Sequence, residues 1–61
     1  MTKLEELRRK AGLTQAELAK LSGVATTTIS RFEVEGLNDA KVKTLLAVAN
    51  ALGCRIGDLF A

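Results

Sequence analysis

The sequence predicts an all-α, compact domain of five short helices that takes up residues 1–61. Apolar residues recur three and four positions apart in four segments, which is the spacing of a helix with one buried face. Three of these segments are followed by glycine, at Gly12, Gly23 and Gly53, and glycine is the usual residue just past a helix C-terminus. No segment shows the strict alternation of apolar and polar residues that is typical of a strand. A chain of this length is sufficient for one small domain.

Composition narrows the classes of function. The chain has one cysteine, Cys54, and no histidine, so neither a Cys/His zinc site nor a Cys–His nucleophile pair is expected. We expect no metal and no small-molecule cofactor, and no enzyme, because a glycine-rich phosphate loop and a cluster of paired carboxylates are also lacking. No apolar run approaches the roughly 20 residues that span a bilayer, so no membrane partner is predicted. A lone thiol suits a reducing compartment and favours a cytoplasmic protein.

The first helix is predicted over residues 2–11. Thr2 and Glu5 have the spacing of a capping box, in which each side chain binds a free backbone N–H of the first turn. The basic residues at 8–10 suit the negative end of the helix dipole. The residues expected on the inward face are Leu4, Leu7 and Ala11.

Residues 14–33 predict two more helices joined by a turn at Gly23. Thr14 and Glu17 form a second capping-box pair, and Ala19 is a small residue suited to a close helix crossing. The expected inward residues are Leu18, Leu21, Val24, Ile29 and Phe32. The outward side of the second helix of this pair is polar and mostly short: Thr26, Thr27, Ser30 and Arg31. Such a helix, carried on another, fits the major groove of B-DNA.

The remaining residues predict a loop and two helices. The loop over 33–39 has Gly36 as its turn residue, and Asn38 or Asp39 is expected to cap the next helix. That helix, over 40–52, should direct Val42, Leu45, Ala49 and Leu52 inward. A short final helical turn over 55–60 contributes the apolar residues Ile56, Leu59 and Phe60.

Several short motifs occur in a fixed order along the chain: Gly12-Leu13-Thr14-Gln15, Glu17-Leu18-Ala19, Gly23-Val24, Thr28-Ile29-Ser30, Glu33, Thr44-Leu45-Leu46, Ala49, Ala51-Leu52-Gly53 and Leu59-Phe60. At these spacings the chain resembles the Cro and lambdoid-repressor type of helix-turn-helix, also called Xre-like, over residues 7–60. The resemblance implies a lambda-repressor-like DNA-binding domain whose recognition helix runs from about residue 26 to 34.

The resemblance also implies roles for individual residues. Thr26, Thr27 and Arg31 match positions that usually face base edges. Gln15 matches a position that usually touches phosphate, with Thr14 as its neighbour. Arg8 and Glu33 match a pair that in some members forms a partly buried ion pair, whereas Cys54 and Ile56 fall where the dimer contact is often made.

The chemistry of these side chains leaves alternatives open. Arg31 can bind guanine O6 and N7 in a fork, or it can pair with Glu35 across the turn. Thr26 and Thr27, with Ser30 on the same face, can meet bases or phosphates, or the threonines serve only to start the helix. Gln15 can donate to phosphate or be a solvated first-turn residue. Lys41 can reach phosphate at the flank or, with Lys43, simply be a solvated face.

The C-terminal region predicts a dimer surface, because four apolar residues exceed what so short a chain can hide: Leu46, Ile56, Leu59 and Phe60. Cys54 lies beside this patch, and the candidate dimer residues are Cys54, Ile56 and Phe60. Cys54 could cross-link two subunits on oxidation; the alternative is a buried, inert thiol.

We therefore expect sequence-specific binding to double-stranded DNA by a transcriptional repressor or regulator, acting as a homodimer on a palindromic operator. Net charge is only +2, with an isoelectric point near 9.0, and the loop carries Glu35 and Asp39 where the family often has Lys or Arg. Those acidic residues favour the alternative, a protein-interaction module on the same fold, such as an antitoxin-like or regulatory dimer. Ala25 also replaces the usual Ser or Thr cap of the recognition helix.

Overall fold

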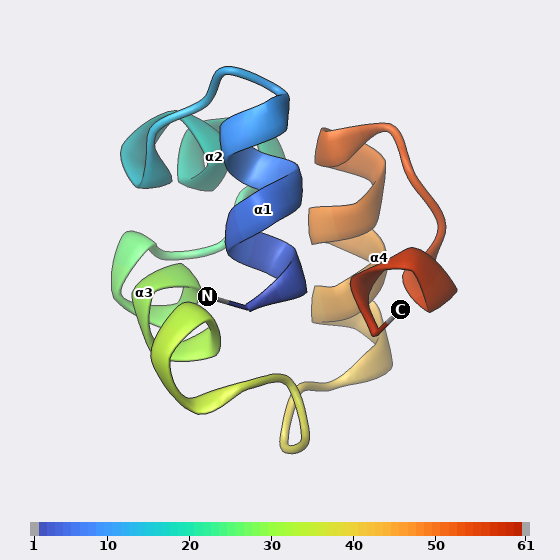
Figure 1. Ribbon diagram of the computed structural model, residues 1–61. Coiled ribbons are helices and arrows are strands. Elements are labelled where there is room, and N and C mark those ends of the chain that lie inside the picture. Colours follow the sequence, from blue (N-terminus) through green and yellow to red (C-terminus); the bar gives the residue numbers. More distant parts are fainter. Residues whose placement is uncertain (1, 61) are drawn as a thin grey trace.

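The structure is a computed structural model in which residues 2–60 are described; the end residues 1 and 61 of the predicted domain lie outside this range. Four α-helices are followed by one 3-10 turn (Figure 1). Their bounds are α1 Lys3–Lys10, α2 Gln15–Ser22, α3 Thr26–Glu35, α4 Val42–Leu52 and η1 Ile56–Leu59. The all-α class is confirmed, and no strand occurs among residues 2–60. The fifth predicted helix is instead a single 3-10 turn, whose short length agrees with the poor helix propensity of Gly57 within it.

The helix ends follow local side-chain chemistry in three places. Thr2 Oγ1 accepts a hydrogen bond from the Glu5 N–H at 3.2 Å, so α1 has the expected cap. Thr14 and Glu17 form a full capping box, with N···O distances of 3.0 and 2.8 Å. Gly23 closes α2 at φ 75°, a left-handed conformation that is strained for any residue with a Cβ.

Two other helix starts lack a side-chain cap. At α3 the N-cap is Ala25, whose methyl group cannot accept a hydrogen bond. The prediction that Asn38 or Asp39 caps α4 is wrong, because the helix begins later and its N-cap is Lys41. Asn38 and Asp39 instead belong to a turn in the loop before α4.

The core is formed where α1 packs on α3 and η1, and where α2 packs on α3 and α4 (Figure 1). Its buried residues are Leu4, Leu18, Ile29, Phe32, Leu37, Leu45, Val48, Ala49 and Leu59. Three residues predicted to face inward do not: Ala11 is exposed, and Leu21 and Val42 are 62% and 66% exposed. Leu37 and Val48 fill core positions that the helical pattern did not single out.

The helices among residues 2–60 are all too short to cross a membrane.

Candidate nucleic-acid interface

Helix α3 has one buried side and one exposed side. Ile29 is fully buried and Phe32 is 4% exposed, and both belong to the core. Thr26, Thr27 and Arg31 are exposed on the other side. The helix is therefore held by its apolar residues while short hydroxyls and one guanidinium remain available to a ligand. Ser30, predicted on the same polar side, is half-buried.

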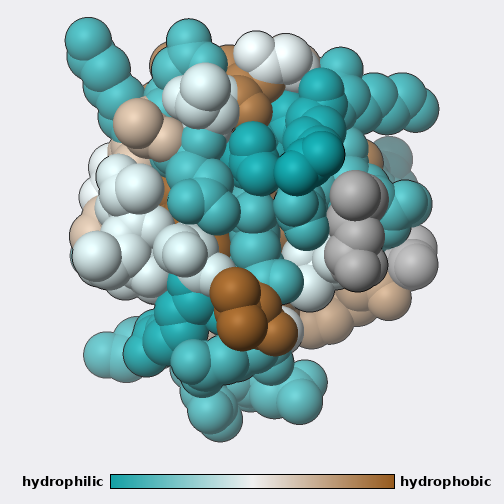
Figure 2. Space-filling view, turned by 60° about the vertical axis from the view of Figure 1, so that its left-hand side comes forward, coloured by the Kyte–Doolittle hydropathy of each residue, from teal (hydrophilic) through white to brown (hydrophobic). Residues whose placement is uncertain are grey.

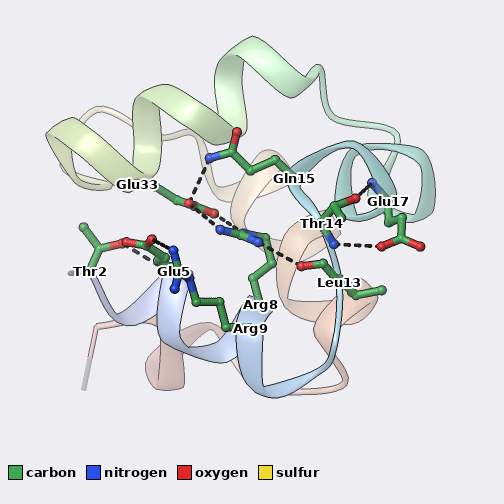
Figure 3. Close-up of polar contacts among 9 residues, drawn as sticks. All are labelled: Thr2, Glu5, Arg8, Arg9, Leu13, Thr14, Gln15, Glu17 and Glu33. Carbon is green, nitrogen blue, oxygen red and sulfur yellow. Dashed lines mark hydrogen bonds and ion pairs between the residues drawn. The ribbon is translucent and has the colours of Figure 1, made fainter.

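A buried ion pair fixes α3 to α1, as the family resemblance implied (Figure 3). The Arg8 guanidinium donates to Glu33 through Nε at 2.6 Å and through Nη2 at 3.1 Å, and both residues are 8% exposed. Arg8 Nη1 also donates to the Leu13 carbonyl oxygen at 2.8 Å, which ties the end of the α1–α2 connection, just before α2, to the same group. Two parallel N–H···O bonds of this kind restrict orientation as well as distance.

The environment of the pair sets both pKa values. Burial acts to raise the pKa of Glu33, but hydrogen bonds from Arg8 and Gln15 and the charges of Arg8 and Arg9 outweigh it, so this pKa lies below its ordinary value. The hydrogen bond to Glu33 raises the pKa of Arg8. Both groups are therefore charged at neutral pH, and α3 is anchored by a fully ionised pair.

Gln15 joins this cluster instead of extending freely into solvent (Figure 3). It is the first residue of α2 and is half-buried, and its Nε2 donates to Glu33 Oε1 at 2.9 Å. The simple alternative of a solvated first-turn residue is therefore wrong for this side chain. An amide nitrogen has two hydrogens, so one N–H of Gln15 is bound to Glu33 and a second is available to another acceptor.

The other candidate phosphate contacts lie at helix starts. Thr14 is exposed at the N-terminus of α2, where its hydroxyl oxygen already accepts the Glu17 N–H. The N-terminus of a helix attracts anions through its free N–H groups and its dipole. Lys41 is exposed at the N-cap of α4 and forms no ion pair among residues 2–60.

Arg31 does not form the ion pair with Glu35 that was the alternative to a base contact. Within the described residues the ion pairs are Arg8–Glu33 and Arg9–Glu5. The guanidinium carbon of Arg31 lies 5.6 Å from the centre of the Phe32 ring, at the distance of a cation–π contact. A hollow of about 210 Å³ opens between Arg31, Thr27 and Thr28 on the exposed side of α3.

Comparison with known proteins agrees with this arrangement. The sequence model of the helix-turn-helix family matches residues 4–59. The chain is also similar to an uncharacterized HTH-type transcriptional regulator of Archaeoglobus fulgidus, with 39% identity over 59 residues that cover 97% of this chain and 83% of the relative. No solved structure matches the chain.

The chain belongs to the helix-turn-helix family, in its Xre and lambda-repressor-like branch. This is a family of DNA-binding transcription regulators and not of enzymes. By position, α2 and α3 are the two helices of the motif, Gly23 is the turn residue, and α3 occupies the place of the recognition helix, by which name it is called below.

The surface of the helix-turn-helix side is mostly hydrophilic. Figure 2 brings forward the side of the molecule on which α2 and α3 lie, and it shows polar and neutral residues over most of the face, with a strongly hydrophobic patch low in the centre and a further hydrophobic area at the top. The largest exposed fraction of any described large hydrophobic residue is that of Val34, at 80%, near the end of the recognition helix. The face is thus suited to a polar partner over most of its area.

The predicted dimer residues differ in exposure. Phe60 is 56% exposed, whereas Cys54 and Ile56 are half-buried and pack against the core. Burial, and to a smaller extent the nearby charge of Asp58, raises the pKa of the Cys54 thiol. A protonated thiol reacts slowly in disulfide formation, which favours the inert role for Cys54. Leu46 and Val42 on α4 are further exposed apolar residues in the C-terminal half.

The side chains within residues 2–60 include no group of three or more His, Cys, Asp or Glu residues that could hold a metal ion.

Proposed function

We propose that this helix-turn-helix domain binds a palindromic operator in double-stranded DNA as a homodimer and acts there as a transcriptional repressor or regulator. The observation that supports it best is the two-sided recognition helix: Ile29 and the Arg8–Glu33 pair fix α3, while Thr26, Thr27 and Arg31 stay exposed. A polar helix fixed in this way matches the dimensions of the major groove.

The proposed contacts fall into two kinds. Arg31, Thr26 and Thr27, with a smaller part for the half-buried Ser30, contact base edges and set sequence preference. Gln15 and Thr14 at the start of α2, and Lys41 at the start of α4, contact phosphates and fix the position of the domain on the duplex.

The small number of base contacts favours a dimer. One recognition helix presents few side chains to the bases, so a single domain binds weakly, whereas two linked copies gain in affinity and selectivity. In the proposed dimer Phe60 supplies exposed apolar surface, and the half-buried Ile56 and Cys54 are the other candidate residues. Half-sites are then expected about 10 bp apart, one turn of the duplex.

The first test is a titration of duplex DNA over a range of salt concentrations, preceded by selection of bound duplexes from a random pool. We expect a palindromic consensus, and a logarithm of the binding constant that falls linearly with the logarithm of salt concentration, by about 0.9 for each phosphate neutralised. Absence of DNA binding at low salt would refute the proposal.

Arg31→Ala is expected to weaken binding to the selected duplex by about 1–3 kcal/mol and to remove the preference at one base position in each half-site. Competition binding against duplexes changed at single positions measures this. The matched control is Lys10→Ala, because Lys10 is also an exposed cation but ends α1, outside the residues proposed to contact DNA or a second subunit. An equal loss on every DNA sequence would make Arg31 a phosphate contact.

A second function is favoured by one feature, the acidic loop. Glu35 and Asp39 are exposed beside the recognition helix, where they repel phosphate. The alternative is a protein-interaction module, antitoxin-like or a regulatory dimer, on the same fold. A stable complex with a protein partner, together with DNA binding that is absent or insensitive to salt, would favour it.

A further inference from the structure

Arg31 lies between two hollows on the surface of the recognition helix. On one side is the hollow that it shares with Thr27 and Thr28. On the other side is a hollow of about 120 Å³ next to the loop after α3, which it shares with Phe32, Glu35, Gly36, Asn38 and Asp39. The Phe32 ring, with which the guanidinium is in cation–π contact, belongs to this second, loop-side hollow. A long flexible side chain at this position can therefore turn to either side.

The loop side carries negative charge. Glu35 and Asp39 are exposed and form no ion pair among residues 2–60. The last turn of α3 has no basic residue, and the C-terminus of a helix is the negative end of its dipole. Arg31 is the one cationic residue among those that line the loop-side hollow. Charge and the aromatic ring thus both attract its guanidinium toward the loop.

We propose that the negative charge of Glu35 and Asp39, although neither carboxylate forms an ion pair with Arg31, draws the Arg31 guanidinium to the loop side in the free protein and so reduces the affinity and base discrimination that Arg31 gives to DNA binding. The inference rests on the proposed DNA-binding function. To reach a base, Arg31 must leave the Phe32 ring and move away from the two carboxylates, and the attraction that is lost is subtracted from the new contact. The acidic residues then set the affinity of one subunit low, which makes operator occupancy depend on both subunits of the dimer.

The position of Arg31 is tested without DNA. Nuclear Overhauser contacts between the Arg31 side chain and the Phe32 ring are expected in the parent protein, and they should weaken in the double variant Glu35→Gln/Asp39→Asn. Parent spectra without such contacts, or contacts unchanged in the double variant, would overturn the proposal irrespective of any DNA result.

The effect on binding is tested by a double-mutant cycle between Glu35→Gln and Arg31→Ala on the selected duplex. Loss of the Glu35 charge should raise the affinity roughly two- to fivefold more in the parent than in the Arg31→Ala background, the range expected for exposed charge pairs. Discrimination between base pairs at the position assigned to Arg31 should rise in the single variant Glu35→Gln. Glu6→Gln is the matched control, because Glu6 is exposed on α1 and the charge change is the same.

The outcomes separate the two proposals. Equal gains in both backgrounds mean that Glu35 acts only by repelling phosphate, and the inference about Arg31 then fails while DNA binding stands. If neither the parent nor any variant binds duplex DNA, the DNA-binding function fails and this inference with it.

Discussion

Replacing Ile29 with aspartate is expected to unfold the domain. Ile29 is fully buried on the inward side of the recognition helix, among the residues that join α1, α2 and α4. The substitution removes a buried aliphatic side chain, which costs about 2–5 kcal/mol, and it places a carboxylate among apolar core residues, with the buried Arg8 guanidinium already paired with Glu33. A domain of this size rarely has more than about 3–5 kcal/mol of stability, so the folded state should not survive.

Circular dichroism and urea titration measure this effect, and Val42→Asp is its control. Val42 is also β-branched but is 66% exposed in the first turn of α4, where an acidic residue suits the helix dipole. Its substitution should change the free energy of unfolding by less than about 0.5 kcal/mol. A cooperative transition of Ile29→Asp near that of the parent would show that Ile29 is not essential to the core.

The starts of α1 and α2, the turn at Gly23 and the main core residues were predictable because they depend on short-range chemistry. The Thr14–Glu17 box and the turn at Gly23 need only residues within a few positions, so the sequence contains all the information they require. Leu18, Ile29 and Phe32 share a helical face with other apolar residues and are buried as expected. The position of the helix-turn-helix followed from these same features.

The exposure of the Leu21 and Val42 side chains could not be predicted in this way. Helical spacing shows which side chains share a face, but not how far along that face a neighbouring element extends. Leu37 shows the same limit in the opposite sense, since it is a loop residue that is buried in the core cluster with Leu4 and Leu59. These outcomes depend on contacts between elements.

The candidate interface was predictable in its residues but not in its contacts. The polar pattern of α3 was enough to single out Thr26, Thr27 and Arg31. The bond from Gln15 to Glu33 joins residues 18 positions apart, and no local pattern specifies it. The loop-side hollow beside Arg31 likewise depends on the path of the loop after α3. The use of Thr26, Thr27 and Arg31 in DNA binding stays a prediction.

Glu33→Gln is expected to cause the second large loss of stability, about 3 kcal/mol. The substitution leaves the Arg8 guanidinium, 8% exposed, without its counter-charge, and breaking one side of a buried ion pair typically costs about 3–5 kcal/mol. The value at the low end is expected because glutamine keeps one acceptor oxygen and Arg8 keeps its bond to the Leu13 carbonyl. The matched control is Glu5→Gln, which breaks the pair with the exposed Arg9 and should cost less than about 1 kcal/mol.

The dependence of the free energy of unfolding on acidic pH gives an independent measurement of the Arg8–Glu33 ion pair. The folded state lowers the pKa of Glu33 from its ordinary value of 4.5. The stabilisation from its ionised form is therefore fully present above about pH 4.5 and is lost as the pH falls toward the lower folded pKa. The free energy of unfolding, measured in urea from pH 7 downward, should fall more steeply below this point in the parent than in Glu33→Gln. Parallel curves for the two proteins would show that the charge of Glu33 does not hold α3 to α1.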